Sequence, residues 1–429
     1  MNYYLLYAAV LAAVIWLYLR RNRRAQAVDR QELREALDAG LGEPPSLHPV
    51  IDPARCIGSG SCARACPEEA LGVVDGKAVL KNGSACIGHG ACLLACPVEA
   101  ISLVFGTEKR GIDIPNISPQ FETNVPGIFI AGELGGMGLV RKAAEQGRQA
   151  MESIHKRSNG KADLDVLIVG CGPAGLSAGL AAIERKMRYR IIEQEESLGG
   201  AVYHYPRNKI TMTAPVQLPL VGQVKFNEVS KETLLEFWHG VVSKTGLKIS
   251  YRERMTGIER QGDQFVVQTD RGSYTTRSVL LAMGRRGTPR KLEVPGEEAS
   301  KVVYRLVDPE QYRGQQVLVV GGGDSALEAA IALADQPGTG VILSYRSAAF
   351  SRVKGRNRDL LAAHEKAGRV QVLLTSSVKT IEVRSVTISH EGADRAFPND
   401  AVIVCAGGEL PTPLLKKIGI EFETKFGSR

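Results

Sequence analysis

The stretch Asp165-Val-Leu-Ile-Val-Gly170-Cys-Gly172-Pro-Ala-Gly175 joins a run of buried-strand residues to a glycine-rich turn. A helix-like stretch follows, and the next strand, Arg190-Ile-Ile-Glu193, ends in an acid. In a dinucleotide-binding unit the glycines let the backbone approach a pyrophosphate at a helix N-terminus, and the acid binds a ribose hydroxyl. Strand, glycines, helix and acid in this order therefore predict an α/β nucleotide-binding fold.

A second motif of the same kind is Gln316-Val-Leu-Val-Val-Gly321-Gly-Gly323-Asp-Ser-Ala326, in which alanine takes the third position. The strand that follows it ends in no acid, and Arg346 and Arg352 come instead. An arginine at this place accommodates the 2′-phosphate of NADP, whereas NAD sites have a carboxylate. We therefore expect NADPH at the second fold, with NADH as an alternative. Solvated surface charge is the other interpretation of the two arginines.

Two such folds in series resemble the two-dinucleotide-binding flavoproteins, and in particular their thioredoxin-reductase-like branch. Leu198-Gly199-Gly200, residues 319–326 and Gly127-Ile-Phe-Ile-Ala-Gly132-Glu133 carry the resemblance, which covers about residues 106–429. It implies that the first fold binds FAD and the second binds NAD(P)H. It also implies that Gly132 and Glu133 contact the flavin, with glutamate where aspartate is usual. Tyr203 and Tyr205 are candidates for stacking on the flavin.

The redox dithiol of thioredoxin reductases is missing from this chain. In that family a Cys-x-x-Cys just before the second fingerprint reduces the disulfide substrate, but residues 303–314 contain no cysteine. Cys171 and Cys405 lie outside the two cysteine motifs considered below, and neither belongs to a Cys-x-x-Cys. We expect both to be buried structural thiols. The cysteine-free form resembles the ferredoxin–NAD(P) reductases of this branch, which pass electrons to iron–sulfur partners.

The order of the pieces also departs from the family. The flavin-contacting segment and its helix, over about residues 106–155, normally follow the NADP fold but here precede the FAD fingerprint. The sequence predicts a circular permutation, because close chain ends permit one. Gly427 should then lie near Gly106, and residues 106–155 should complete the FAD domain. A remnant of a second flavoprotein copy, or a segment that docks on a partner, is the alternative.

Two cysteine motifs, thirty residues apart, precede these folds. Each resembles the Cys-x2-Cys-x2-Cys-x3-Cys-Pro run of bacterial two-cluster ferredoxins, which supplies three ligands to one cluster and the fourth to the other. The resemblance implies a first thiolate set and a second thiolate set, each binding one iron–sulfur cluster. The first set is Cys56, Cys62 and Cys96, and the second set is Cys66, Cys86 and Cys92.

Both motifs lack the second cysteine of the family, and Ser59 and His89 stand in its place. Either residue could be the fourth ligand of its cluster, and imidazole ligation raises the potential of Rieske clusters. Alternatively the fourth iron has no protein ligand, or its loss leaves [3Fe–4S] instead of [4Fe–4S]. Zinc is disfavoured because its sites use paired Cys-x2-Cys ligands. A disulfide framework is disfavoured because it needs an oxidising compartment.

The chain begins with an apolar run. Residues 3–19 are uncharged, and Arg20, Arg21, Arg23 and Arg24 follow them. At a rise of ~1.5 Å per residue the run is ~25 Å long, at the short end of a bilayer span. A secretory signal would carry its charge before the run, so a cleaved signal is only the alternative. We expect a transmembrane anchor in the cell inner membrane, with the arginines on anionic lipid and the later residues in the cytoplasm.

Length and charge limit the remaining possibilities. The chain has 429 residues and a net charge of +8, of which four positive charges lie in the arginine cluster, so we expect no nucleic-acid partner. The expected fold class is α/β, with two permuted Rossmann-like folds, a small α+β ferredoxin domain and a transmembrane helix. The expected parts are an anchor (1–24), a linker (25–50), the ferredoxin domain (51–105), the permuted part of the FAD domain (106–160), the FAD-binding domain (161–290), the NAD(P)H-binding domain (291–400) and a return segment (401–429).

These features predict a membrane-anchored oxidoreductase that passes electrons between NADPH, FAD, two iron–sulfur clusters and an external partner. The partner is a redox protein or a membrane electron carrier. Since the cofactors carry the chemistry, we expect no catalytic side chain. The alternatives are an electron-transfer subunit of a membrane complex, a redox sensor with labile clusters, and a thiol or disulfide reductase. A homodimer is left open.

Overall fold

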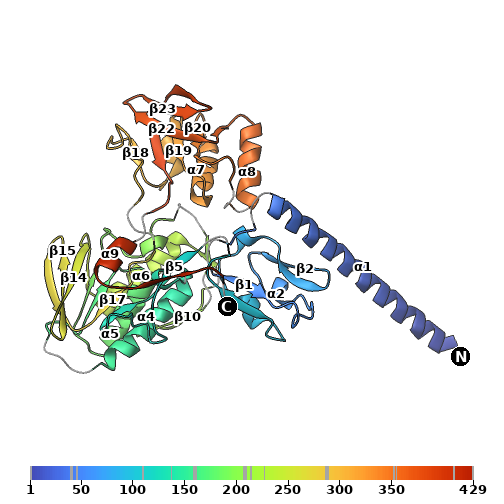
Figure 1. Ribbon diagram of the computed structural model, residues 1–429, viewed down its shortest axis with the longest axis horizontal. Coiled ribbons are helices and arrows are strands. Elements are labelled where there is room, and N and C mark those ends of the chain that lie inside the picture. Colours follow the sequence, from blue (N-terminus) through green and yellow to red (C-terminus); the bar gives the residue numbers. More distant parts are fainter. Residues whose placement is uncertain are drawn as a thin grey trace. The chain divides into compact units, whose positions relative to one another are not determined.

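The computed structural model describes the chain apart from short gaps, over residues 2–38, 42–44, 47–108, 111–136, 138–157, 162–205, 210–212, 215–226, 228–285, 289–350, 353, 355–408 and 411–427. The chain forms two compact units (Figure 1). The first comprises residues 1–112, 349–358 and 425–429, and the second comprises residues 113–348 and 359–424.

The first unit begins with α1, a single helix over Asn2–Asp38 (blue in Figure 1). In the part of the chain that the structure describes, no helix is long and apolar enough to cross a membrane. The predicted transmembrane anchor and the predicted inner-membrane location are therefore wrong. The physical reason is length, because a span needs ~20 consecutive apolar residues. The apolar run before Arg20 is shorter, and α1 continues through charged residues without a break.

The ferredoxin part of the first unit consists of two similar halves. Its elements are β1 (His48–Ile51), α2 (Ser61–Arg64), β2 (Leu71–Val74), β3 (Lys77–Leu80), a 3₁₀ turn (Gly83–Ala85), α3 (Ala91–Leu94) and β4 (Ile101–Val104). Strand β1 pairs antiparallel with β4, and β2 pairs antiparallel with β3. Leu71, Ala78 and Ile101 form a small core together with cysteines of both halves. Pairing of the first strand with the last thus closes the two halves on each other.

The charged second half of α1 is bound to the hairpin of β2 and β3. The Asp29 carboxylate accepts a hydrogen bond from the Val73 N–H at 2.8 Å and pairs with the Lys81 ammonium at 3.0 Å. Arg30 forms an ion pair with Asp75 at the hairpin turn. Residues up to Asp38 thus belong to a helix that docks on the hairpin of β2 and β3.

The first nucleotide-binding fold of the second unit is a parallel sheet in the order β13-β8-β7-β17-β6. Its strands are β6 (Ile128–Ile130), β7 (Val166–Val169), β8 (Tyr189–Ile192), β13 (Ile249–Ser250) and β17 (Val279–Leu281). All residues of β6, β7 and β17 are buried, as in parallel sheets that are covered on both faces. The edge strand β6 comes from the segment that precedes the glycine fingerprint in the sequence.

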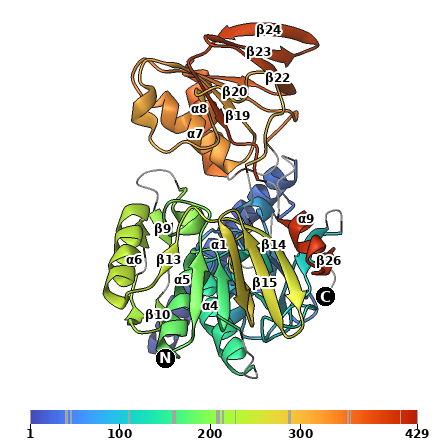
Figure 2. The ribbon, with the colours of Figure 1, turned by 90° about the vertical axis from the view of Figure 1, so that its left-hand side faces the viewer.

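The two faces of this sheet are covered by different elements (Figure 2). Because successive side chains point to opposite faces, Phe129 and Ile168 pack with α4, α5 and α6, whereas Ile128 and Leu167 pack with a three-stranded meander and α9. The helices are α4 (Val140–His155), α5 (Pro173–Glu184), α6 (Lys231–Thr245) and α9 (Thr412–Lys417), and the meander is β14 (Met255–Gln261), β15 (Gln264–Thr269) and β16 (Gly272–Thr276).

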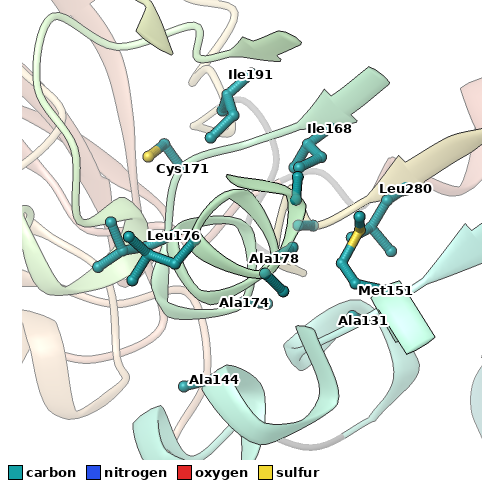
Figure 3. Packing of buried hydrophobic residues seen from close by; sticks show 14 of the residues in the cluster. Ala131, Ala144, Met151, Ile168, Cys171, Ala174, Leu176, Ala178, Ile191 and Leu280 are labelled. Carbon is teal, nitrogen blue, oxygen red and sulfur yellow. The ribbon is translucent and has the colours of Figure 1, made fainter. Parts of the chain in front are cut away.

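Helices α4 and α5 make a close contact. An ideal Cβ on Gly147, in the middle of α4, would lie 2.1 Å from the Ala174 carbonyl oxygen at the start of α5. The two backbones can therefore approach this closely only if residue 147 has no side chain. Figure 3 shows α5 with Ala174 and Ala178 between the sheet, represented by Ile168, and α4, represented by Ala144.

Two short hairpins lie in the chain between the first fold's second strand and α6. Strand β9 (Ile210–Met212) pairs with β12 (Glu228–Ser230), and β10 (Val216–Leu218) pairs with β11 (Gly222–Val224). The Ser230 hydroxyl then caps α6 by accepting a hydrogen bond from the Thr233 N–H at 3.2 Å. The buried residues Leu218 and Val224 join the core beneath α5 and α6.

The second nucleotide-binding fold repeats the plan with the parallel sheet β18-β25-β19-β20-β21. Its strands are β18 (Val302–Val303), β19 (Gln316–Val320), β20 (Gly340–Ser344), β21 (Val370–Leu373) and β25 (Ala401–Val404). In the sequence, α7 (Asp324–Ala334) follows β19, and α8 (Gly355–Lys366) follows β20. Its meander is β22 (Ser376–Ile381), β23 (Ser385–His390) and β24 (Ala393–Pro398).

The end of the chain returns to the segment that precedes the first fingerprint. Strand β26 (Phe422–Lys425) pairs with β5 (Ile112–Pro115). The Gly427 N–H donates a hydrogen bond to the Phe105 carbonyl oxygen at 2.9 Å, and an ideal Cβ on Gly427 would lie 2.9 Å from the Gly106 carbonyl oxygen. Gly427 therefore lies near Gly106, which is the proximity that a circular permutation requires.

We expect Gly147→Ala to lower the free energy of unfolding by about 1–3 kcal/mol, because the added methyl group forces α4 away from α5. The control is Gly240→Ala in α6, where an added Cβ meets nothing within 4 Å. That control should raise the stability by up to ~1 kcal/mol, because alanine favours a helix over glycine. Urea unfolding measures both variants. Equal stability of Gly147→Ala and the unmodified chain would contradict the close contact.

Candidate functional site

The glycines of the first fingerprint divide into two kinds. An ideal Cβ on Gly175 would lie 1.9 Å from the Gly170 carbonyl oxygen, and Gly170 has a φ of +99°. These two residues must be glycine for the turn itself to fold. Gly172 has a φ of −74°, and an ideal Cβ on it would meet nothing closer than 3.8 Å. The fold does not require glycine at 172, so the open space beside it fits a bound pyrophosphate.

Two other segments converge on this turn, one containing Gly199 and Gly200 and the other containing Gly132. The Gly199 N–H donates to the Cys171 carbonyl oxygen at 2.9 Å, and an ideal Cβ on Gly200 would lie 3.1 Å from the Gly172 Cα. An ideal Cβ on Gly132 would lie 3.2 Å from the Ala174 side chain. The structure thus brings Gly132, Gly199 and Gly200 to the N-terminus of α5, where the positive end of the helix dipole suits an anion.

The predicted ribose-binding acid also lies at this turn. The buried Glu193 carboxylate accepts hydrogen bonds from the Cys171 N–H at 2.7 Å and the Glu195 N–H at 3.1 Å. Burial raises the pKa of this carboxyl, although the backbone donors oppose the rise. Glu193 is thereby held against the glycine turn, in the place where a carboxylate can accept a ribose hydroxyl.

The other residues predicted to contact the flavin are Glu133, Tyr203 and Tyr205, and Gly132 joins Glu133 to the helix α4. Gly132 has a φ of +87° and donates its N–H to the Gln146 side chain of α4 at 2.8 Å, and Glu133 begins the 3₁₀ turn that follows. The Tyr203 hydroxyl bonds to Glu196 at 3.3 Å. Tyr205 packs against the core of the first fold. The stacking role of both tyrosines stays a prediction.

Sequence reasoning missed an apolar cavity beside this site. The cavity lies between α4, α5, α6 and the hairpin of β10 and β11. Its walls include Pro173, Leu176, Val216, Phe237 and Trp238. The whole lining comes from four separate segments of the sequence, α4, α5, the hairpin of β10 and β11, and α6, so no local sequence motif identifies it. The cavity begins at the first turn of α5, next to the glycine cradle.

The second fingerprint has the same two kinds of glycine. An ideal Cβ on Gly321 would lie 2.4 Å from the Cys405 carbonyl oxygen, whereas one on Gly323 would meet nothing within 4 Å. Gly323 has an ordinary φ of −100°, and Ala326 is fully buried in α7. Open space at Gly323 again fits a pyrophosphate.

The predicted 2′-phosphate site is only partly described. Arg346 is exposed, two residues after the end of β20 at Ser344. Arg352 lies outside the described residues. The Tyr345 ring covers Gly322, because an ideal Cβ on that glycine would lie 2.2 Å from the ring. Arg346, just after β20, is thus exposed to solvent, whereas the ring of the preceding Tyr345 packs on the glycine turn.

The ferredoxin part contains two matching cavities, one for each predicted thiolate set. The first, of about 290 Å³, is lined by Cys56, Cys62 and Cys96, and Ser59 also faces it. The second, of about 360 Å³, is lined by Cys66, Cys86 and Cys92, and His89 also faces it. In both cavities two cysteines come from one motif and the third comes from the other motif, as the crossed pattern requires.

The thiols of each set influence one another. Burial raises the pKa of Cys62, and the charges of Cys56 and Cys96 raise it further. Burial likewise raises the pKa of Cys92 to about 11, and the charges of Cys86 and Cys66 add to the rise. Binding of iron would stabilise such buried thiolates, because the positive charge of the metal offsets the cost of burying their negative charge.

Backbone donors already face two sulfurs of the first thiolate set. The Cys56 sulfur accepts a hydrogen bond from the Ala78 N–H at 3.4 Å, and the Cys96 sulfur accepts one from the Ala100 N–H at 3.2 Å. Among the residues that the structure describes, no three His, Cys, Asp or Glu side chains lie close enough to hold a single metal ion.

The two remaining cysteines lie apart from both sets. Cys171 is buried in the glycine turn, and burial raises its pKa. Cys405 follows β25, and burial raises its pKa to about 12. A thiol that stays protonated at neutral pH is a poor nucleophile. Neither cysteine therefore provides dithiol chemistry at the flavin fold.

Comparison with known proteins gives two family matches. The pyridine nucleotide-disulphide oxidoreductase family matches residues 167–427. A 4Fe-4S dicluster domain matches residues 48–97. The first match covers the first nucleotide-binding fold from β7 onward together with the second fold, and the second match covers both thiolate sets.

Among individual proteins, the ferredoxin–NADP reductase of Thermus thermophilus is 32% identical over 255 residues, which are 57% of this chain and 72% of the relative. The ferredoxin–NADP reductase of Ignicoccus hospitalis is 29% identical over 61% of this chain and 83% of the relative. Among solved structures, the bacillithiol disulfide reductase Bdr of Bacillus cereus aligns with a TM-score of 0.52 at 24% identity, over 60% of this chain and 81% of that structure. The last likeness shows the fold alone.

We expect Gly172→Ala and Gly323→Ala to separate the two nucleotide sites without harming the fold. An added Cβ at residue 172 would lie 3.8 Å from the Gly200 Cα, an ordinary contact, and one at residue 323 would meet nothing within 4 Å, so the melting temperature of the flavin-free chain should stay unchanged. Gly172→Ala should lose FAD on gel filtration, because the methyl group occupies the pyrophosphate space. Gly323→Ala should keep FAD but raise the KM for NADPH at least tenfold. Full FAD retention by Gly172→Ala would show that the cradle lies elsewhere.

Proposed function

Because this chain belongs to the pyridine nucleotide-disulphide oxidoreductase family and carries a 4Fe-4S dicluster domain, we propose that it acts like a ferredoxin–NADP reductase whose ferredoxin is part of the same chain. The predicted resemblance and the predicted class, an FAD- and NAD(P)H-dependent oxidoreductase with an iron–sulfur domain, are confirmed by these matches and by the relatives named ferredoxin–NADP reductase. A single observation carries the proposal: two nucleotide cradles and two crossed thiolate sets occur together in a chain without a redox dithiol.

The residues of the first fold would hold FAD. Gly172 and the N-terminus of α5 would face its pyrophosphate, and Glu193 would accept a ribose hydroxyl. When bound, FAD exchanges two electrons with a nicotinamide and single electrons with iron–sulfur clusters. The apolar cavity lined by Leu176 and Trp238 would exclude water from the space beside the cradle. Residues 106–155 would complete this domain as a circularly permuted segment, because they supply β6 and α4.

The residues of the second fold would hold NADPH. Gly323 would face the pyrophosphate, and Arg346 would pair with the 2′-phosphate at the place where NAD-binding chains have an acid. The first and second thiolate sets would each hold one cluster, which is [4Fe–4S] or [3Fe–4S]. Electrons would then leave to, or arrive from, an external redox protein. The relative potentials decide the direction.

A thiol or disulfide reductase is the competing function. A relative named bacilliredoxin reductase Bdr, from Bacillus subtilis, is 26% identical over 61% of this chain and 82% of the relative. Of the two cysteines of the flavoprotein part, Cys171 is buried and Cys405 is partly buried; both have raised pKa values, and they do not form a pair. In a thiol or disulfide reductase, the two thiolate sets would also have no role in the reaction. We therefore place it second.

We expect an anaerobic NADPH titration of the cluster-loaded protein to bleach the flavin absorbance first. An electron paramagnetic resonance signal of reduced clusters should then appear. Dithionite reduction of the same sample is the control, because it shows how much cluster can be reduced. Flavin bleaching together with turnover of a thiol or disulfide, and without any reduced-cluster signal, would favour the competing function. No flavin bleaching at all would favour an electron-transfer subunit or a sensor.

We expect Arg346→Ala to raise the KM for NADPH about tenfold or more and to leave the KM for NADH within a factor of two. The reason is that only NADPH carries the 2′-phosphate that the guanidinium would bind. Steady-state kinetics with ferricyanide as acceptor measures both constants. Arg369→Ala is the matched control, because Arg369 is an exposed arginine of the same fold that pairs with Asp335. An equal rise for both nucleotides would contradict the NADPH assignment.

A further inference from the structure

The two halves of the ferredoxin part have the same backbone at the position where the fourth thiolate is missing. Ser59 and His89 each lie between two glycines with φ values from +67° to +79°. An ideal Cβ on Gly58 would lie 2.0 Å from the Gly76 carbonyl oxygen, and one on Gly88 would lie 2.8 Å from the Leu47 carbonyl oxygen. Both loops are thus held by close backbone contacts, and the halves differ only in the side chain that they present.

The Ser59 hydroxyl is already engaged by its own loop. It bonds to the Ser61 hydroxyl at 3.3 Å and accepts a hydrogen bond from the Ser61 N–H at 3.4 Å. The Arg64 guanidinium in turn donates to the Ser61 hydroxyl at 3.3 Å. Ser59 is exposed to solvent. A hydroxyl that is tied back to the first turn of α2 and open to water is a weak ligand for iron.

The second half has no equivalent of this network. Thirty residues on, Ser61 is replaced by Ala91 and Arg64 by Leu94, neither of which can form a side-chain hydrogen bond. His89 faces the cavity of the second thiolate set, and its Nδ1 is buried without a hydrogen-bond partner in the described structure. A buried nitrogen of this kind costs stability unless something binds it. A cluster iron in the adjacent cavity would do so.

We propose that the two clusters are different: His89 is the fourth protein ligand of the cluster in the second thiolate set, while the first thiolate set holds a cluster with three protein ligands only. This inference rests on the proposed function, since it assumes that both sets bind clusters. The chemistry agrees with it, because imidazole is an accepted cluster ligand in Rieske centres. The first cluster would have one iron open to water near Ser59 and would lose that iron on oxidation.

The first test uses the full chain with its clusters reconstituted anaerobically and its histidines labelled with ¹⁵N. Pulsed electron paramagnetic resonance of the dithionite-reduced protein should show a nitrogen directly coupled to one cluster. The coupling should vanish in His89→Ala and persist in Ser59→Ala. In His89→Cys it should also vanish, while the iron content stays at the level of the unmodified chain and the potential of that cluster falls, because anionic thiolate replaces neutral imidazole.

The second test is brief exposure to ferricyanide. The unmodified chain should convert one cluster to the three-iron form, and His89→Cys should behave in the same way. Ser59→Cys should suppress the conversion, because it closes the open position. Ser61→Ala is the control for changes in the loop around Ser59 and should still convert. These readouts do not depend on turnover.

The outcomes separate this inference from the proposed function. Clusters that form normally but show no ¹⁵N coupling, or coupling that survives in His89→Ala, would overturn the His89 assignment and leave the relay intact. Suppression of the three-iron form by Ser61→Ala would overturn the open position at Ser59. Failure of the unmodified chain to bind iron and sulfide at all would overturn the proposed relay, and the inference with it.

Discussion

The close approach of α4 to α5 is the contact on which the flavin-type fold depends. Gly147 lets the α4 backbone reach the Ala174 carbonyl at the first turn of α5, and this brings Gly132 to the same turn. The strand before α4, β6, then forms the edge of the parallel sheet beside β17. Without that contact the N-terminus of α5 would lack one wall of its cradle. A segment that precedes the fingerprint in the sequence is thus required for the site that the fingerprint builds.

Glycines show how the chain separates folding from binding. Gly175 and Gly321 are needed because a side chain would strike the backbone of their own fold. Gly172 and Gly323 are not needed for that reason, since an added Cβ would meet the protein at 3.8 Å or more at Gly172 and not within 4 Å at Gly323. Both folds show the same division at the same motif positions.

The ferredoxin part combines duplicated loops with different side chains. Its loops repeat with the same left-handed glycines, and each of the two crossed cavities is lined by three cysteines, two from one half and one from the other. The two halves differ at the position of the missing cysteine. In the first half the Ser59 hydroxyl bonds to the Ser61 hydroxyl, whereas in the second half the buried Nδ1 of His89 has no hydrogen-bond partner in the described structure. A duplicated fold can hold two clusters with different coordination, because ligands are set by single side chains whereas the loops are set by glycine geometry.

Local patterns in the sequence determined much of this protein. Fingerprint spacing predicted both nucleotide folds, because the glycine turns are only a few residues long. The repeated cysteine motifs showed the resemblance to two-cluster ferredoxins, and that resemblance implied the two crossed sets. Apolar run length was a poorer guide: residues 3–19 suggested a membrane span, but α1 runs on through charged residues and docks through Asp29 on β2. Only the tertiary structure placed Gly427 beside Gly106, formed the apolar cavity from four segments and left the His89 nitrogen without a partner. Those features depend on contacts between residues far apart in the chain, which local spacing does not specify.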